Sequence, residues 1–279
     1  MPFVHGGHAF IPVQPLTRGL LIRLLGVIQR KLGSFDENFT HLQQALFEVL
    51  SGSGDREITD LAELHRVVER AKQVKQDAIR SYGGQVILCE PTLDARQAKL
   101  EVVLKETGAT FVHPYDQAEI IAGQGTAMLE LAQQVKDLDI VVVPVGGGGL
   151  LAGCSLVAEH EQIKIIGAEP EGADDAYRSI DTGELVLSHT PDTICDGLLT
   201  TLGARNFKII RDKVDSILLV SDQEIIQAMS LIWTRAKLVV EPSSAVTLAV
   251  VLRNPGLFEG KRVGLLLSGG NVDLTDLPF

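Results

Sequence analysis

Short apolar runs alternate with longer amphipathic stretches along the chain after residue 84. The runs are rich in β-branched residues, which is typical of strands buried on both faces. They lie at residues 85–89, 110–113, 139–145, 164–168, 215–220 and 262–268. The stretches between them predict helices over residues 92–107, 126–136, 150–158, 223–237 and 242–252. Strand–helix alternation with short connections predicts an α/β fold, a doubly wound parallel sheet with helices on both faces.

The first 84 residues show helical patterns separated by glycine-rich breaks. Helices are predicted over residues 16–32, 39–50 and 60–82, with a loop at residues 51–55. Gly83 and Gly84 stop the third helix, because glycine commonly ends helices. The regular strand–helix alternation therefore begins only after this point.

Charge and cysteine usage narrow the class of protein. The 279 residues carry a formal net charge of −11, which argues against nucleic acid or an anionic membrane as a partner. No stretch is long and apolar enough to span a bilayer. The three cysteines have no CxxC spacing and cannot all pair, so a reduced, cytoplasmic setting is the simplest.

The first 35 residues differ in charge from the rest, with four basic and no acidic side chains. Such a composition resembles an organellar transit peptide. A solvated helix that ends at Gly33 explains it at least as well, so organellar targeting stays open.

Four consecutive glycines, Gly146, Gly147, Gly148 and Gly149, follow the most apolar of the predicted strands and precede a predicted helix. Glycine lacks a Cβ, so such a turn can bring backbone N–H groups close to a ligand. These donors lie at the positive end of a helix dipole, where phosphate binds readily. A tight turn alone needs only one or two glycines, so the pattern favours an anion site.

Two further turns follow strand ends, where ligands bind in sheets of this kind. Ser268 begins a Ser-Gly-Gly-Asn turn and can hydrogen-bond a heterocyclic nitrogen. The acidic stretch at residues 169–175 offers carboxylates and carbonyls that suit Mg²⁺, Mn²⁺ or Ca²⁺. The alternative for the acidic stretch is a solvated loop in which Asp174 caps the next helix.

Residues 73–279 resemble the fold-type II pyridoxal-phosphate enzymes, and within them the serine racemase and threonine/serine dehydratase group. The stretches that carry the resemblance occur in family order. They are Val74-Lys75-Gln76-Asp77-Ala78, Gly123-Gln124-Gly125-Thr126, Val143-Pro144-Val145-Gly146-Gly147-Gly148-Gly149, Gly167-Ala168-Glu169-Pro170, Asp196-Gly197, Val240-Glu241-Pro242 and Leu267-Ser268-Gly269-Gly270-Asn271.

The resemblance implies pyridoxal 5'-phosphate as cofactor, with its phosphate on residues 146–149 and its pyridine nitrogen facing Ser268. It places Gly197 and Glu241 in the same site, although Glu241 serves equally well to orient the helix that begins at Pro242. It implies a divalent cation, Mg²⁺ or else Mn²⁺ or Ca²⁺, on Glu169, the carbonyl of Ala173, and Asp175. ATP as an effector and a homodimer are further expectations.

The resemblance also implies a reaction. L-serine, D-serine and L-threonine are the expected substrates, for racemisation or for β-elimination to a 2-oxo acid and ammonia. A neutral serine beside the ring nitrogen makes the cofactor a weaker electron sink than an acidic partner would, which suits these two reactions. Both reactions begin with removal of the α-proton, so the sequence leaves racemase and dehydratase open.

The first 72 residues depart from the family. Asp36 follows Ser34 and Phe35, where the family has its Schiff-base lysine, and the loop at residues 51–55 only weakly matches the loop that grips the substrate carboxylate. Lys31, Lys72 and Lys75 lack the motif around them. We therefore expect three parts: an atypical segment 1–72, a remnant of an incomplete smaller domain at 73–116, and the large cofactor domain at 117–279.

Three interpretations remain open. In the first, the chain is an enzyme of this group whose N-terminal sequence has diverged or been misassembled, and whose activity is impaired. In the second, it is a non-catalytic paralogue that keeps the phosphate and metal sites. In the third, it is a damaged paralogue that folds poorly.

Overall fold

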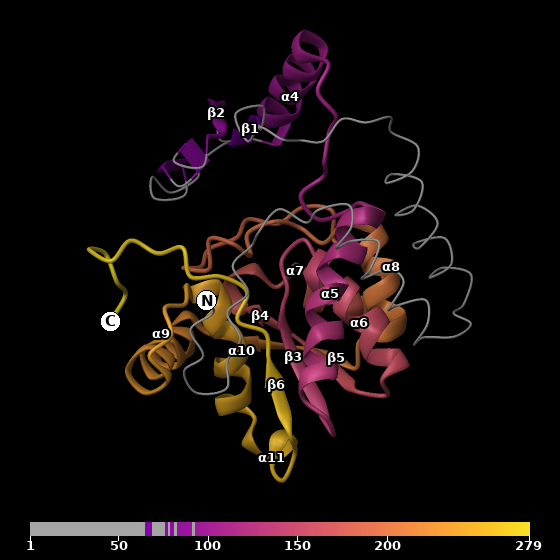
Figure 1. Ribbon diagram of the computed structural model, residues 1–279, viewed down its shortest axis with the longest axis vertical. Helices are drawn as coiled ribbons and strands as arrows, with labels where there is room; N and C mark the ends of the chain where they lie inside the picture. The colour runs from indigo at the N-terminus through magenta and orange to yellow at the C-terminus, as the bar shows by residue number, and fades with distance from the viewer. Residues whose placement is uncertain (1–64, 69–75, 78, 81–82, 91–92) are drawn as a thin grey trace, which may run out of the picture. The chain divides into compact units, whose positions relative to one another are not determined.

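A computed structural model describes residues 65–68, 76–77, 79–80, 83–90 and 93–279 (Figure 1). The chain divides into two compact units, residues 1–54 and 55–279, and all described residues belong to the second. The predicted helices at 16–32 and 39–50, and Asp36, lie outside the described residues. Among the described residues, no helix is long and apolar enough to cross a membrane.

A four-stranded, fully parallel sheet forms the centre of the second unit. Its strand order is β5-β4-β3-β6, with bounds Ser216–Val220, Lys164–Pro170, Ile140–Pro144 and Val263–Leu265. Val142 of β3 aligns with Ile166 of β4 on one side and with Leu265 of β6 on the other. All five residues of β3 are buried, as the apolar run predicts.

Helices cover both faces of this sheet, which confirms the doubly wound α/β prediction (Figure 1). The helices α5 (Ala118–Gln134), α6 (Gly149–His160) and α8 (Ala204–Lys213) pack together on one face. On the other face, α9 (Asp222–Leu231) and α10 (Pro242–Arg253) form a core with Ile140, Val142, Ile166 and Ala168 of the strands. Alternate residues of β3 and β4 thus serve different layers.

The helices α5 and α6 approach each other at two glycines. A Cβ on Gly153 would lie 2.6 Å from the backbone nitrogen of Gly125, and it would also collide with the carbonyl oxygen of Ile121. A Cβ on Gly125 would lie 2.7 Å from the carbonyl oxygen of Gly153. This contact fixes the position of α6, and hence of the glycine loop before it.

Shorter elements complete the fold. The segment after β4 forms the 3-10 turn Glu171–Ala173 and α7 (Asp175–Thr182), and α11 (Pro255–Phe258) precedes β6. The helix predicted over 223–237 is α-helical only to Leu231 and then continues as a π-helical turn, Ile232–Ala236. A helix directly after Asp174 was considered only as an alternative for the acidic stretch, and α8 was not predicted from the sequence.

A separate two-stranded parallel sheet joins β1 (His65–Val68) to β2 (Gln85–Leu88), and α4 (Leu93–Thr107) follows. The helix predicted over 60–82 is therefore wrong at residues 65–68, because pairing with β2 determines the backbone there. The predicted strand at 110–113 is also wrong. His113 instead begins a turn, in which its backbone N–H donates to the Gln117 side chain and its ring Nδ1 accepts from the N–H of Asp116.

Candidate functional site

The glycine loop at residues 146–149 connects the carboxyl end of β3 to the N-terminus of α6. All four glycines are buried, and Gly148 adopts a φ of 88°, which a residue with a side chain rarely adopts. The carbonyl oxygen of Gly147 accepts hydrogen bonds from Gly203 N–H at 3.1 Å and from Asn206 Nδ2 at 2.7 Å. The loop after β3 is thereby tied to the start of α8.

The N–H groups of this loop fit an anion. Within the described part of the chain, none of the four N–H groups donates a hydrogen bond. Buried backbone N–H groups are rarely left without a partner. Because these donors also lie at the N-terminal end of α6, the loop suits a phosphate group.

Tyr115 lies against this loop. A Cβ on Gly147 would collide with the Tyr115 ring, and one on Gly149 would lie 2.8 Å from the Tyr115 carbonyl oxygen. The next residue, Asp116, accepts hydrogen bonds through Oδ1 from the N–H groups of Arg205 and Asn206 at the start of α8. The turn after His113 therefore packs against Gly147 and Gly149, where a side chain on the loop would collide with Tyr115.

The other sequence-predicted cofactor residues converge on the first turn of α10. Gly197 N–H donates to Ser243 Oγ at 3.0 Å, and a Cβ on Gly146 would lie 3.4 Å from the Gly197 carbonyl oxygen. Glu241 precedes α10, and its backbone N–H donates to the Gly269 carbonyl oxygen at 3.1 Å. The loops that contain Gly197 and Gly269 are far apart in sequence, and both are hydrogen-bonded to residues at the N-terminus of α10.

Ser268, in the Ser-Gly-Gly-Asn turn, lies beside Ser244 of the first turn of α10. Ser244 Oγ accepts from Gly269 N–H and donates to the Gly269 carbonyl oxygen, each at 2.7 Å. The hydroxyl oxygens of Ser244 and Ser268 lie 3.4 Å apart. The side chain of Ser268 itself is exposed and available to a ligand.

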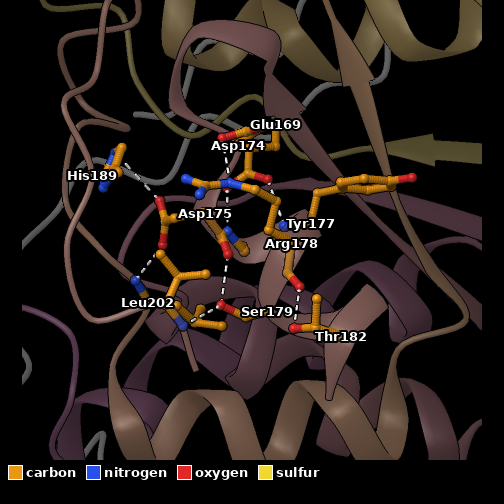
Figure 2. A network of polar contacts seen from close by, with 11 residues as sticks. Glu169, Asp174, Asp175, Tyr177, Arg178, Ser179, Thr182, His189 and Leu202 are labelled. Carbon is orange, nitrogen blue, oxygen red and sulfur yellow. Dashed lines mark hydrogen bonds and ion pairs between the residues drawn. The ribbon is translucent and has the colours of Figure 1, made fainter. Parts of the chain in front are cut away.

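The acidic stretch folds around the N-terminus of α7 (Figure 2). Glu169, at 0% exposure, accepts hydrogen bonds from the N–H groups of Ala176 at 3.0 Å and Tyr177 at 2.8 Å. Burial raises the pKa of the Glu169 carboxyl well above its ordinary value, although these two N–H groups favour the ionised form. Glu169 therefore caps the start of α7 through these N–H groups. Asp174, the cap in the alternative interpretation of the sequence, occupies the N-cap position but its side chain accepts no hydrogen bond from the backbone N–H groups of the helix.

Asp175 is also fully buried, but its two oxygens differ. Oδ2 accepts from the N–H of Leu202 at 2.8 Å, whereas Oδ1 has no hydrogen-bond partner. Burial raises the pKa of the Asp175 carboxyl, against the effect of the Leu202 N–H and the nearby His189. Oδ1 lies 3.5 Å from His189 Nε2 (Figure 2).

The three predicted metal residues are close in the fold, since Ala173 ends the 3-10 turn that links Glu169 to Asp175 and is itself buried. No group of three or more His, Cys, Asp and Glu side chains in the described segments is arranged around a metal position. An ionised carboxylate has about four lone-pair positions, so Glu169 can still accept a cation beside its two N–H bonds. The unpaired Asp175 oxygen is the feature that fits a cation.

Comparison with known proteins decides the family. A sequence profile described as "Pyridoxal-phosphate dependent enzyme" matches residues 65–269. This chain belongs to the pyridoxal-phosphate dependent enzyme family. The family match begins at residue 65, so residues 1–64 lie outside it.

The relatives of this chain fall in the predicted group. The chain is 47% identical over 211 residues to the beta-hydroxyaspartate dehydratase of Paracoccus denitrificans (strain Pd 1222), covering 75% of this chain and 67% of that protein. It is 46% identical over 218 residues to the serine racemase of Dictyostelium discoideum, with 76% and 67% covered. The crystal structure of the T.th. threonine deaminase matches with a TM-score of 0.71 and 37% identity, covering 84% of this chain and 75% of that one.

These findings confirm the family resemblance and the fold-type II architecture inferred from the sequence motifs. Sequence reasoning did not identify Tyr115, Asn206, Ser243, Ser244 or His189. Ser243 and Ser244 had a local signal, because they directly follow the Val240-Glu241-Pro242 motif at a predicted helix start. The others had none, since their contacts join segments far apart in the chain.

Proposed function

We propose that this chain is a pyridoxal-phosphate protein of the serine racemase and serine/threonine dehydratase type. The observation that carries the proposal is the buried glycine loop, whose four N–H groups donate to no acceptor in the described region, in a chain that belongs to this enzyme family. The substrates would be small hydroxy amino acids such as L-serine, D-serine and L-threonine.

The residues have distinct roles in this proposal. Gly146, Gly147, Gly148 and Gly149 bind the phosphate through backbone N–H groups, and Asn206 holds the loop in position. Ser268, positioned by Ser244, faces the ring nitrogen, with Gly197 and Glu241 beside it. When bound, pyridoxal phosphate supplies the electron sink for α-proton removal. In this proposal the neutral hydroxyl of Ser268, and not the carboxylate of Glu241, faces the ring nitrogen, which suits racemisation or loss of the β-hydroxyl.

Glu169, the Ala173 carbonyl and Asp175 would hold a divalent cation, for which Mg²⁺ is the expected ion and Mn²⁺ or Ca²⁺ the alternatives. The unpaired Oδ1 of Asp175 supports this assignment. Such an ion would join α7 to the loop that carries Leu202, because Asp175 already contacts both. A homodimer, an effect of ATP and a cytoplasmic location complete the proposal.

Catalysis by this chain is proposed to be impaired. Asp36 replaces the lysine that the family uses to bind the cofactor covalently, and a carboxylate can neither form that bond nor act as the ammonium does. The alternative, a non-catalytic paralogue that binds cofactor and metal, is favoured by the same replacement.

Cofactor titration separates these functions. Full-length protein is titrated with pyridoxal phosphate, followed by its absorbance, then reduced with borohydride and analysed by mass spectrometry. Saturable binding without covalent attachment to a lysine supports the binding function with impaired catalysis. Covalent attachment would identify a substitute lysine, with Lys31, Lys72 and Lys75 as the candidates. Absence of saturable binding would overturn the proposed function.

A further inference from the structure

The turn at residues 113–117, which packs against the glycine loop, is itself held by a histidine ring. His113 Nδ1 accepts hydrogen bonds from the backbone N–H groups of Tyr115 at 3.2 Å and of Asp116 at 2.8 Å. Pro114, which separates His113 from these two residues, has no N–H to donate. Because both partners are N–H donors, Nδ1 carries no proton, and the neutral ring has its proton on Nε2. The imidazole thus takes the place that an Asn or Asp side chain commonly has in a turn.

Further contacts fix the orientation of this ring. It lies edge-to-face with the Tyr115 ring, with centroids 4.8 Å apart, and edge-to-face with the Phe111 ring, with centroids 5.8 Å apart. The backbone N–H of His113 donates to the Gln117 side chain at 2.8 Å. The packing of the ring therefore directs Nδ1 toward the two N–H groups of the turn.

The turn is linked to the glycine loop through Asn206, which is fully buried. Asn206 Nδ2 donates to the carbonyl oxygen of Tyr115 at 3.1 Å and to that of Gly147 at 2.7 Å. Asp116 Oδ1 accepts from the backbone N–H of the same asparagine at 3.2 Å. The two residues that the His113 ring holds are therefore the residues that position the side chain bound to the glycine loop.

The surroundings of the ring favour its neutral form. Burial lowers the pKa of His113, the nearby Asp116 carboxylate opposes this effect, and Arg96 of α4 adds to it. Among the described residues, Asp116 and Arg96 are the charged groups that act on the ring. A proton on Nδ1 would face two N–H donors, so Nδ1 can be protonated only if the turn opens. The hydrogen bonds of the turn are thus complete above the ordinary pKa of 6.5 and are lost as the pH falls toward the lowered pKa.

We propose that His113 is a positioning residue for the phosphate site: its neutral ring holds the turn against the glycine loop, and protonation of the ring weakens phosphate binding. The inference rests on the proposed function, in which the glycine loop binds phosphate. It predicts a sign opposite to that of simple electrostatics, since a positive charge on the ring would otherwise strengthen the binding of an anion. Weaker anion binding at acid pH is therefore the signature of an opened turn.

Sulfate is the probe, because its charge is constant between pH 5 and pH 8, whereas the phosphate group of the cofactor gains a proton in this range. The affinity of full-length protein for sulfate is measured by calorimetry at pH 8 and at pH 5, with circular dichroism at both to establish folding. Pyridoxal phosphate is titrated in parallel at pH 8. Wild type should bind sulfate about threefold to tenfold more weakly at pH 5, which corresponds to the net loss of one hydrogen bond.

Two variants at position 113 separate the hydrogen bond from the charge. Asn Oδ1 is as many bonds from the Cα as His Nδ1, so His113→Asn keeps the acceptor and does not titrate in this range. It should bind sulfate within about twofold of wild type at pH 8 and show no loss at pH 5. His113→Leu, which has no acceptor, should bind sulfate about threefold to tenfold more weakly than wild type at pH 8, with no further loss at pH 5. His160→Asn removes a histidine at the end of α6 and should keep the wild-type pH response.

The outcomes distinguish this inference from the proposed function. Unchanged or stronger binding of sulfate by wild type at pH 5 would overturn the role of His113 and leave the phosphate site intact. A loss of affinity at pH 5 in folded His113→Asn would also overturn it, because the change would then come from another group. If neither sulfate nor pyridoxal phosphate binds at pH 8, the phosphate site of the proposed function is wrong, and this inference fails with it.

Discussion

A single carbonyl group shows how side chains remote in sequence fix the glycine loop. The carbonyl oxygen of Gly147 accepts hydrogen bonds from the backbone N–H of Gly203 and from Asn206 Nδ2, so both donors bind the loop through its carbonyl group. The N–H groups of the loop remain available to a ligand. At the scale of the residue, the loop is shaped by what its carbonyl binds and by the absence of side chains next to Tyr115.

Replacing Gly147 by Val should abolish stabilisation by pyridoxal phosphate and by inorganic phosphate, because the new side chain collides with the Tyr115 ring and displaces the loop. A ligand at 100 times its Kd stabilises the wild type by about 2.7 kcal/mol. Thermal unfolding with and without each ligand measures the difference. Gly256→Ala, at a position where a Cβ meets nothing within 4 Å, is the control and should respond as wild type does. An equal rise in Tm for Gly147→Val would show that the phosphate is bound elsewhere.

Thiol reactivity should follow burial. Cys154 and Cys195 are buried, and burial raises the pKa of each thiol to about 12. Since only the thiolate reacts, both should resist alkylation in the folded protein at pH 8. Iodoacetamide labelling followed by peptide mass spectrometry should show modification at the partly exposed Cys89, and at all three cysteines after denaturation. Rapid labelling of Cys154 in the native protein would contradict the packing of α6.

At the scale of the element, the contact between α5 and α6 positions the glycine loop. Gly153→Ala should destabilise the fold by about 1–3 kcal/mol, because the added methyl group meets the backbone of α5. Gly123→Ala is a matched control on α5, where a Cβ meets nothing within 4 Å and alanine favours the helix by up to about 1 kcal/mol. Urea unfolding should therefore show opposite signs for the two variants. A neutral Gly153→Ala would mean that α5 and α6 are not in close contact.

The capping of α7 by Glu169 yields a prediction with two parts. Glu169→Ala should lower the free energy of unfolding by about 1–3 kcal/mol, because the buried N–H groups of Ala176 and Tyr177 lose their acceptor. It should also remove the rise in Tm that we expect millimolar Mg²⁺ or Mn²⁺ to give the wild type. Asp174→Ala, which removes only an exposed pair with Arg178, is the control. A full metal response in Glu169→Ala would leave the helix cap as the only role of Glu169.

For the molecule as a whole, the sequence pattern predicted those elements whose structure is determined by residues adjacent in the chain. The β3–glycine loop–α6 unit followed from an apolar run, four glycines and a helical spacing that are adjacent in sequence. The strand β1 was missed because its pairing with β2 overrides a helical pattern. His189 and Asn206 were missed because their contacts join residues 14 and 91 positions apart, for which the sequence has no periodic signal.

The last prediction concerns activity, and it belongs to the whole chain. Racemisation needs one group on each face of the cofactor to remove and return the α-proton, and the family resemblance assigns these to a lysine and to a serine of the carboxylate-gripping loop. We expect from the sequence that Asp36 stands in place of the lysine and that residues 51–55 are a poor match to the second loop. A carboxylate at position 36 would also repel the substrate carboxylate and the cofactor phosphate. We therefore expect cofactor binding without turnover of serine.

The assay uses purified full-length protein with pyridoxal phosphate and Mg²⁺, and measures pyruvate and D-serine formed from L-serine. The rate should equal that of free cofactor. Asp36→Lys should restore covalent attachment of the cofactor but not turnover, since the loop that grips the substrate carboxylate is still lacking. Turnover clearly above free cofactor in the unchanged chain would contradict this prediction. It would mean that Lys31, Lys72 or Lys75 performs the role of the missing lysine, and replacing each by Ala would identify which one.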